Sequence, residues 1–504
     1  MSNSDLLDLV SSISAARVSN VVLSRVEGQT FSKVRLNSHP ESLRQFDSVI
    51  CSEEARQKVK DIHYDVILPS VSEKRLENKF QSSNEASENT LAFISAILSL
   101  FTRLSSWNAR GIALRLTATS PSDDTALRVV SRSVCIKSKR NHFKYIGLDL
   151  HLHLTGRFPL VRCVSSFDFE RLDSNSTNPS GRRVYPDLIA SMSVSLPALK
   201  SISWEFYMPP RRMVSRRQEF WVALGRALAL PEFSHLACAR ITLYDRDPRN
   251  EGADLHSLVV GSRDATVDLA IQKICTLPTL TTLHLCGNWS LSSIAFAKGF
   301  GLRVNSVYID LSSVTPDGRW LFDPIPPLSD EENFNDDDLA SDSEHEVLHD
   351  FDSADSDSID FLGEKAEDIA NFELPVREIH GEPSAHAFGP LAIALANAVI
   401  QSSSCLGRLE VHLLGSLSQV HLGYFNPDTE EVYKPRGANF WSIWSRPKVR
   451  ARFEAGAATW HISVQGDVAY IGWKVPAGLR KAMENGVGAG NVFAYSHAKD
   501  LEME

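Results

Sequence analysis

Two short stretches of this sequence carry side chains whose types and spacing could do chemistry. The first, "DLHLH", sets Asp149, His151 and His153 at alternate positions, so on a strand all three would share one face. A carboxylate and two imidazoles are zinc ligands, but a structural zinc site needs a fourth ligand, and nothing nearby supplies it. We therefore interpret this stretch as a polar strand face and predict no metal site.

The second stretch, "PPRRMVSRR", brings four arginines together. A cluster of this kind could contact phosphates of a nucleic acid or act as a nuclear import signal. The alternative is a solvated loop that leads into a helix beginning at Gln218. The residues that would bind a partner here are Arg211, Arg212, Arg216 and Arg217.

Signatures of catalysis are missing from the sequence. There is no H-E-x-x-H, no G-x-S-x-G and no G-x-x-x-x-G-K-[ST]. The closest approach, "GDVAYIGWK", has the wrong spacing for a phosphate-binding loop. We expect a protein that is not an enzyme and that uses no cofactor.

A strongly acidic segment divides the chain. Asp330 to Asp360 contains fourteen Asp and Glu and no Lys or Arg, which accounts for the formal net charge of -10. Because it is poor in apolar residues, we expect a disordered insertion. Calcium binding is the alternative, but the Gly and Glu of an EF-hand loop are absent. Ser341 and Ser343 each precede a Glu by three residues, a spacing that acidophilic kinases favour, so phosphorylation is a hypothesis for both.

Length and composition indicate a folded protein outside that segment. The chain has 504 residues, of which 43% are hydrophobic, enough for a substantial core. The N-terminus lacks the features of a signal peptide, and the longest apolar run is about half of a membrane span. The seven cysteines never form C-x-x-C and are expected to be reduced core thiols. These features predict a cytoplasmic or nuclear protein that is neither secreted nor bound to a membrane.

Apolar periodicity predicts several helices with one buried face. In "SENTLAFISAILSLF", Ser87 or Asn89 is the expected cap, and the expected buried face holds Leu91, Ile94, Ile97 or Leu98, and Phe101. Three further helices are predicted over 186–194, 218–229 and 264–274. Each of these three ends near a Leu-Pro pair that precedes a predicted strand, at Leu196, Leu230 and Leu277.

The third of these junctions, "LPTLTTLHLCGN", has the leucine-rich-repeat spacing L-x-x-L-x-L-x-x-N. Leu280, Leu283 and Leu285 should point into a core, while Thr282 and His284 lie on the opposite, partner-binding face. Since helices alternate with strands, we expect parallel strands with outer helices, an irregular leucine-rich-repeat-like solenoid of the α/β class. A looser apolar-x-x-apolar-x-apolar spacing recurs at Phe31, Val34 and Leu36, at Val59, Ile62 and Tyr64, at Val304, Val307 and Ile309, and at Leu406, Leu409 and Val411.

Several blocks resemble fungal F-box proteins that carry a long C-terminal domain of uncharacterised function. The similar blocks are "TFSKVRL", "ARQKVKDIHYDVILP", "LPALKSISWEFYMPPRRMVSRR", "LPTLTTLHLCGN", "VTPDGRWLFD" and "YIGWKVPAGL", within Phe31 to Leu479. The resemblance implies an N-terminal F-box that docks on the linker subunit of an SCF ubiquitin ligase, and a repeat domain that holds a target. Met1 to Gly28 departs from the family pattern, because it has no Leu-Pro entry and no Trp near its end.

The predicted organisation has four parts: a degenerate F-box-like or helical segment (1–30), a leucine-rich-repeat-like domain (31–328), the acidic insertion (329–371) and a Trp-rich continuation of the body (372–504). We expect a non-catalytic protein-binding module, either the substrate-recognition part of an SCF-type adaptor or a relic of one. The alternative is a nucleic-acid or chromatin-associated scaffold that uses the Arg211–Arg217 patch.

Overall fold

The computed structural model describes residues 22–23, 32–70, 83–121, 145–147, 158–169, 183–209, 211, 213–245, 257–259, 266–324, 380–402, 404–414, 418–426, 455–466 and 475–495. The segments "DLHLH" and Asp330–Asp360, with Ser341 and Ser343, lie outside these residues, and so does Arg212.

One large sheet organises the described residues, and its strands follow each other in space in the order in which they occur along the chain. Successive strands from β2 to β14 pair in parallel, and so do β16 and β17. The antiparallel pairs are β1 with β2, β14 with β15, and β15 with β16. The thirteen strands are β1 (Val22–Leu23), β2 (Lys33–Asn37), β3 (Asp61–Ile67), β4 (Ile112–Thr119), β6 (Val164–Phe169), β8 (Ser201–Tyr207), β9 (Cys238–Tyr244), β10 (Thr282–Trp289), β11 (Ser306–Leu311), β14 (Arg408–Leu414), β15 (Ser418–Phe425), β16 (Thr459–Gly466) and β17 (Val492–Tyr495).

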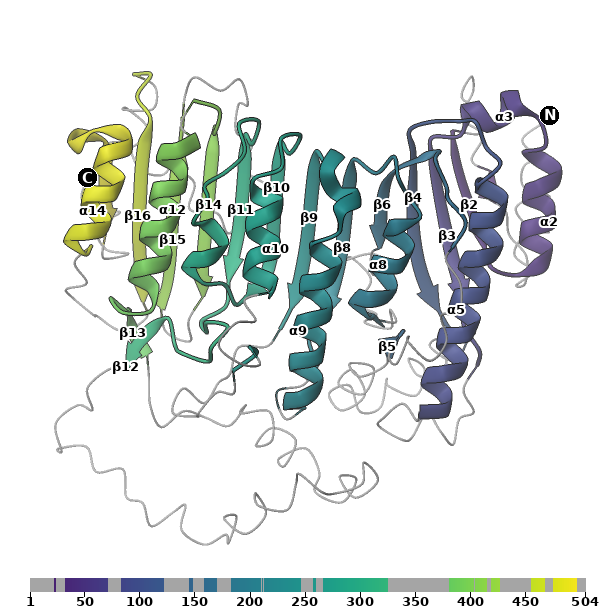
Figure 1. Ribbon diagram of the computed structural model, residues 1–504, viewed down its shortest axis with the longest axis horizontal. Helices are drawn as coiled ribbons and strands as arrows, with labels where there is room; N and C mark the ends of the chain where they lie inside the picture. The colour runs from purple at the N-terminus through teal and green to yellow at the C-terminus, as the bar shows by residue number, and fades with distance from the viewer. Residues whose placement is uncertain are drawn as a thin grey trace, which may run out of the picture.

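Helices form a layer over one face of this sheet, as Figure 1 shows. None of the helices in the described part of the chain is long and apolar enough to cross a membrane. The helices are α2 (Pro40–Val49), α3 (Glu53–Lys58), α5 (Ser83–Leu104), α8 (Pro186–Val194), α9 (Val214–Leu228), α10 (Thr266–Cys275), α12 (Phe388–Ser402) and α14 (Ala477–Val487), with the short 3-10 helices η3 (Pro231–His235), η4 (Ser293–Phe296) and η9 (Ala489–Asn491).

The core lies between the helices and the sheet, because every second strand residue points toward the helices. Its largest side chains come from strands far apart in the chain and include Tyr64, Trp204, Trp289 and Trp460, each at most 1% exposed. Trp460 is the one tryptophan of the Trp-rich end that falls within the described residues, and it is a core residue.

The three predicted units of helix, Leu-Pro and strand are confirmed as α8–β8, α9–β9 and α10–β10, and the three strands pair in parallel. The second helix begins earlier than expected, at Val214. Arg216 and Arg217 therefore belong to the first turn of α9, not to a loop before it.

The four looser matches also coincide with strands, namely β2, β3, β11 and β14. Their shared spacing has one physical cause. The first apolar residue lies just before the strand, and the next two are its first inward-pointing side chains, as with Val59, Ile62 and Tyr64 of β3, all fully buried.

The opening of β10 matches the leucine and asparagine pattern in detail. Leu280, Leu283 and Leu285 are fully buried. The Asn288 side chain donates a 2.7 Å hydrogen bond to the backbone carbonyl of Asp245, at the end of the neighbouring strand β9. Asn288 thus links the end of β10 to the residue that follows β9.

Two expectations from the sequence are wrong. Helix α5 begins at Ser83, so Asn89 lies within the helix and is buried, and neither Ser87 nor Asn89 caps it. Of the expected buried face, Ile94, Ile97 and Phe101 are buried as predicted. Leu91 and Leu98 are 50% and 39% exposed, because the face toward the sheet runs through Phe93, Ile97, Leu100 and Leu104.

The cysteines correct a further expectation. The six cysteines in the described ranges are free thiols, and Cys163 and Cys275 are buried as predicted. Burial raises the pKa of Cys275 to about 12 and that of Cys163 to about 11. Cys51, however, is exposed, because it lies in the turn between α2 and α3.

The sheet continues across the acidic segment. Strand β14, after the segment, pairs in parallel with β11, before it. The chain leaves at β12 (Phe322–Pro324) and returns at β13 (His380–Pro383), and these two strands pair antiparallel. A second small sheet joins β5 (Tyr145–Ile146) to β7 (Arg183–Val184). The described parts on both sides of residues 325–379 therefore share one sheet.

Candidate functional site: the polar face of the sheet

The sheet face opposite the helices carries a continuous row of polar side chains, which we call the central row. Its members pair in register across eleven adjacent strands, from β2 to β16. Apart from one glycine, every position has a charged, hydroxyl or imidazole side chain. The row is Arg35, His63, Arg115, Asp168, Ser203, Arg240, His284, Tyr308, Glu410, Gly423 and His461.

Exposure changes along the central row. Arg35 and Arg240 are exposed, and the residues between them are half-buried. Toward the C-terminal strands the row becomes buried, with Glu410 and His461 at 2% and 1% exposure. The accessible part of the row is therefore the part on β2 to β11.

Polar contacts hold the first strands of the row in place. The Arg35 Nε donates to His63 Nδ1 at 3.2 Å, and the other ring nitrogen of His63 lies 3.2 Å from the Thr117 hydroxyl. Burial, assisted by the charge of Arg35, lowers the pKa of His63, which favours a neutral imidazole. Arg115 and Asp168 lie 4.0 Å apart on neighbouring strands.

A series of five rings crosses the later strands, one from each of β10, β11, β14, β15 and β16. Successive ring centroids are separated by 6.0, 5.3, 4.6 and 5.4 Å. The rings belong to His284, Tyr308, His412, His421 and His461. Packing of the core fixes only the apolar face of these strands. It does not explain why four imidazoles lie together on the opposite face.

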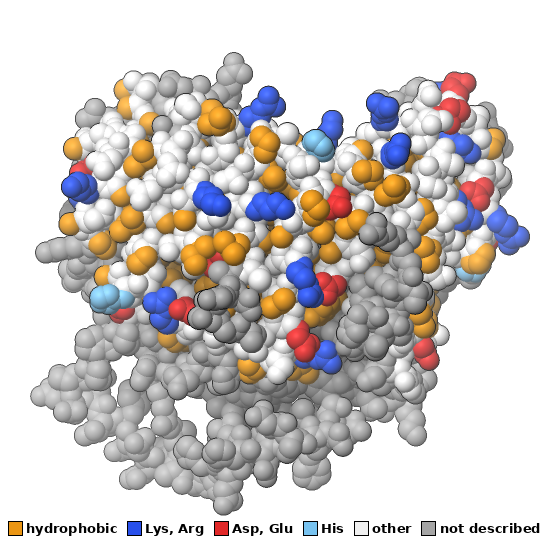
Figure 2. All heavy atoms as spheres, in the orientation of Figure 1, with side chains coloured by type: hydrophobic (Ala, Val, Ile, Leu, Met, Phe, Trp, Pro, Cys, Tyr) orange, Lys and Arg blue, Asp and Glu red, His pale blue; other side chains and the backbone are white. Residues whose placement is uncertain are grey.

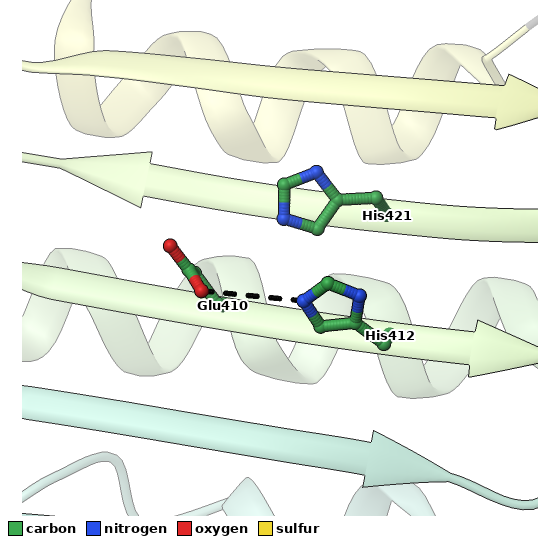
Figure 3. Close-up of side chains that lie close together, drawn as sticks. All are labelled: Glu410, His412 and His421. Carbon is green, nitrogen blue, oxygen red and sulfur yellow. Dashed lines mark ion pairs between the residues drawn. The ribbon is translucent and has the colours of Figure 1, made fainter. Parts of the chain in front are cut away.

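Glu410, His412 and His421 form a polar cluster on this face (Figure 3). The Glu410 Oε2 lies 4.0 Å from the His412 Nε2, and one ligand atom from each of the three residues lies within 4.8 Å of the others. Arg408 donates to the same carboxylate, with 2.8 Å from its Nε to Oε1 and 2.7 Å from its Nη2 to Oε2.

Of the residues singled out in the sequence, Thr282 and His284 lie on this face as expected and are half-buried. His284 belongs to the central row and to the ring series. Thr282 lies two residues before His284 on the same strand, in register with Cys238 and Ser306.

The arginine patch has a different environment. Arg217 is 5% exposed and binds Asp245 with both terminal nitrogens, at 2.9 and 2.6 Å. Arg211 lies 3.5 Å from the same carboxylate, and Arg216 pairs with Glu219 at 3.2 Å. Arg211 and Arg217 thus connect the start of α9 to the residue that follows β9, whereas Arg216 pairs within α9 and has a side chain that is 45% exposed.

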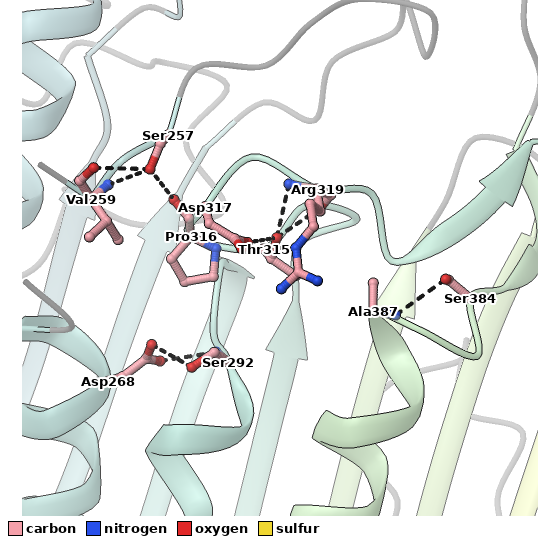
Figure 4. A network of polar contacts seen from close by, with 10 residues as sticks. All are labelled: Ser257, Val259, Asp268, Ser292, Thr315, Pro316, Asp317, Arg319, Ser384 and Ala387. Atoms are coloured by element: carbon pink, nitrogen blue, oxygen red, sulfur yellow. Dashed lines mark hydrogen bonds and ion pairs between the residues drawn. The ribbon is translucent and has the colours of Figure 1, made fainter. Parts of the chain in front are cut away.

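Over the described residues of the helix-covered face, Figure 2 shows charged side chains singly or in small groups among apolar and neutral ones. The polar contacts at one edge of the sheet, seen in Figure 4, fix loops: Asp268 accepts hydrogen bonds from the backbone and hydroxyl of Ser292, at 3.0 and 2.7 Å, and Ser292 in turn caps η4.

The residues that sequence reasoning missed are Glu410, His412, His421 and His461. A signal was present, because "LEVHLL", "VHLGYF" and "TWHISV" each alternate apolar residues with a polar one on a single face. What could not be read was the antiparallel register that places His412 opposite His421.

In comparisons with known proteins, no family model matches this chain, and neither a curated protein nor a solved structure matches it.

Proposed function

We propose that this chain is a non-catalytic protein-binding module that recognises its partner through the exposed part of the polar sheet face. We further propose that it is the substrate-recognition part of an SCF-type ubiquitin ligase adaptor, or a relic of one. The second statement rests on the resemblance to fungal F-box proteins and is tested separately from the first.

The repeated units support a solenoid interpretation. Parallel strands in chain order, with the described helices on one side of them, match the arrangement of leucine-rich-repeat proteins, whose strand face commonly holds the ligand. The hydrogen bond from Asn288 to the preceding repeat supports the same interpretation. We propose an irregular leucine-rich-repeat-like solenoid that changes to antiparallel pairing at β15.

The observation that carries the proposal is the central row. A parallel sheet usually has helices on both faces and apolar strands throughout. Here the strands have one apolar and one polar face, with alternating burial in β3 and β8. Mixed charges spread over a broad surface, such as Arg115 with Asp168 beside it, suit a protein surface of complementary charge better than a small molecule.

The nucleic-acid alternative receives no support from the arginine patch. Phosphate binding needs accessible cations, whereas Arg217 and Arg211 are occupied by the carboxylate of Asp245. Salt-dependent binding of DNA or RNA that is lost in Arg216→Ala would reverse this preference.

Affinity capture tests the face directly. Full-length tagged protein is compared with Arg240→Glu, on the polar face, and with Lys298→Glu, an exposed residue that follows η4 in the helix layer. Both changes alter the charge equally. We expect the captured partners to fall several-fold with Arg240→Glu and to be retained with Lys298→Glu. Equal recovery with all three proteins would contradict binding through this face.

The adaptor step has its own experiment. Purified SCF linker subunit is mixed with the full-length chain, and an F-box protein with an intact F-box serves as the positive control. Stable co-elution supports an active adaptor. Failure to co-elute, while the control succeeds, restricts the proposal to a relic that binds targets without the ligase.

A further inference from the structure

Two neighbouring strands bring a carboxylate and two imidazoles together near the buried end of the polar face. Strands β14 and β15 pair antiparallel, and their register sets His412 directly opposite His421. Glu410 lies two residues before His412, so both point to the same side of the sheet. Figure 3 shows the three side chains on the side of the strands that faces away from the helices.

The residue opposite Glu410 explains how His421 comes close to it. That residue is Gly423, which has no side chain. A Cβ atom added there would lie 3.5 Å from Cε1 of His421 and 2.8 Å from Cε2 of Phe425, so both rings lean over the glycine. The imidazole of His421 therefore extends along its strand toward the carboxylate, between His412 and Phe425.

We propose that Glu410, His412 and His421 form a binding site for a divalent transition-metal ion, with Zn²⁺ as the ion best suited to it. Two imidazole nitrogens and one carboxylate oxygen are a common zinc ligand set. The three ligand atoms lie within 4.8 Å of one another. Around a tetrahedral zinc ion with bonds of about 2.0–2.1 Å they would be about 3.4 Å apart, a contraction that side-chain rotation supplies.

The charge and burial of the site suit a cation. Glu410 is 2% exposed. The guanidinium of Arg408 lies against this carboxylate, with 2.8 Å from its Nε to Oε1, and favours the charged form of the group. The group is thus an anion at neutral pH. Each carboxylate oxygen has two lone pairs, so Oε2, although it also lies 2.7 Å from Nη2 of Arg408, can bind a metal ion while the Arg408 Nε remains on Oε1 and orients the carboxylate.

His461 completes the surroundings of the site. It lies on β16, the next strand, with its ring centroid 5.4 Å from that of His421 and only 1% of its surface exposed. With three protein ligands in place, the fourth zinc position is taken either by His461 or by a water molecule. The visible spectrum of the Co²⁺-bound protein distinguishes His461 from water as the fourth ligand, because the spectrum depends on the ligand set and on the coordination number.

The test is metal binding by the full-length protein after removal of metal with a chelator. Zn²⁺ is titrated calorimetrically, and Co²⁺ is added to record its visible absorption. The site variants are Glu410→Gln and His421→Gln, each nearly equal in volume to the native residue. The matched control is His284→Gln, which changes a histidine of the same ring series two strands away from His412.

The expected result is one zinc ion bound with submicromolar affinity and a Co²⁺ spectrum with nitrogen ligands. Both site variants should lose affinity by more than about 100-fold, beyond the roughly 10- to 100-fold that a change in an outer-shell residue causes. The control variant should bind zinc as the native protein does. Circular dichroism verifies that each variant is folded.

Two results would overturn the proposal. In the first, the native protein binds no zinc, which would make the cluster an ion network of Arg408, Glu410 and His412 without a metal. In the second, zinc binds but is lost on changing His151 and His153 to Gln instead of the site residues, which would move the metal to the "DLHLH" segment. Neither result affects the partner-binding proposal, since Arg240 is not part of this site.

Discussion

Leu283 and His284 are neighbours in the chain but have opposite environments. Leu283 is fully buried between Ala239 and Val307 of the adjacent strands, while His284 is half-buried on the polar face. Leu283→Ala should lower the free energy of unfolding by about 2–5 kcal/mol, because it removes buried methyl groups and leaves a cavity. His284→Ala should cost less than about 1 kcal/mol. Urea denaturation measures both, and equal losses would mean that the two faces are equally buried.

Asp268 gives a prediction about pH. Burial raises the pKa of its carboxyl group, opposed by the hydrogen bonds from Ser292. The folded state then binds this proton more tightly than the unfolded chain does, so the contribution of the group to stability is largest below its unfolded pKa and is lost as pH rises through the folded pKa. Asp268→Asn does not titrate and should lack this loss.

The measurement is the free energy of unfolding of both proteins at about pH 4 and pH 7, on either side of the usual range of a carboxyl group. The native protein should lose stability relative to Asp268→Asn as pH rises. If the stability of the native protein instead rises relative to Asp268→Asn as pH rises, the folded state favours the charged carboxylate, which accepts the hydrogen bonds from Ser292.

For single residues, the sequence predicts on which face of a strand a side chain lies better than it predicts which side chains of other strands it contacts. The alternation of leucines with Thr282 and His284 was enough to assign faces, and the structure confirms it. The meeting of His412 with His421 depends on pairing between two strands, which no spacing within one strand encodes. Arg217 shows the same limit, because its partner Asp245 is 28 residues away in the chain and directly follows strand β9.

Helix α9 is fixed to the sheet by that buried ion pair. Arg217→Ala would leave the carboxylate of Asp245, itself 6% exposed, without its main partner, and should lower the free energy of unfolding by about 3–5 kcal/mol. Arg216→Ala removes the neighbouring but exposed pair with Glu219 and should change stability by at most about 0.5 kcal/mol. Thermal unfolding of the two variants distinguishes them. A similar small effect in both would contradict the structural role of Arg217.

Helices and strands could be predicted from the sequence where local features, such as proline positions and apolar spacing, agree with the tertiary contacts. Proline at the start of α8 and the Leu-Pro pairs after three helices fixed those boundaries closely. Helix α5 was less predictable, because packing against the sheet selects Phe93 and Leu100 as its inner face although Leu91 is equally apolar. Apolar content alone cannot decide between two faces that are both rich in leucine.

The acidic segment offers a test at the scale of the whole molecule. Strands β12 and β13 pair, so the chain leaves and re-enters the body at neighbouring points. Residues 325–329 and 361–379 suffice to bridge these points, and loop-closure entropy depends only weakly on length. Deleting 330–360 should therefore leave the melting temperature nearly unchanged. A fall of many degrees in scanning calorimetry would show that the segment contributes packing to the fold.

The whole molecule joins strands on both sides of that segment into one sheet with a polar face. Its continuity could not be predicted from the sequence, because β11 and β14 are separated by about a hundred residues that include the acidic run. The central row exists only because eleven strands keep register. Function, in this proposal, belongs to that assembled surface and not to any single motif.

The most direct test of partner recognition by this face is site-specific photo-crosslinking. A photoreactive amino acid replaces Arg240 in the full-length protein, and the same amino acid replaces Lys298 as the control on the helix side. After irradiation in cell extract, we predict a discrete covalent adduct with a single partner protein at position 240 and none at position 298. Adducts of equal yield at both positions, or an adduct at 298 alone, would contradict the central claim that the polar sheet face binds the partner.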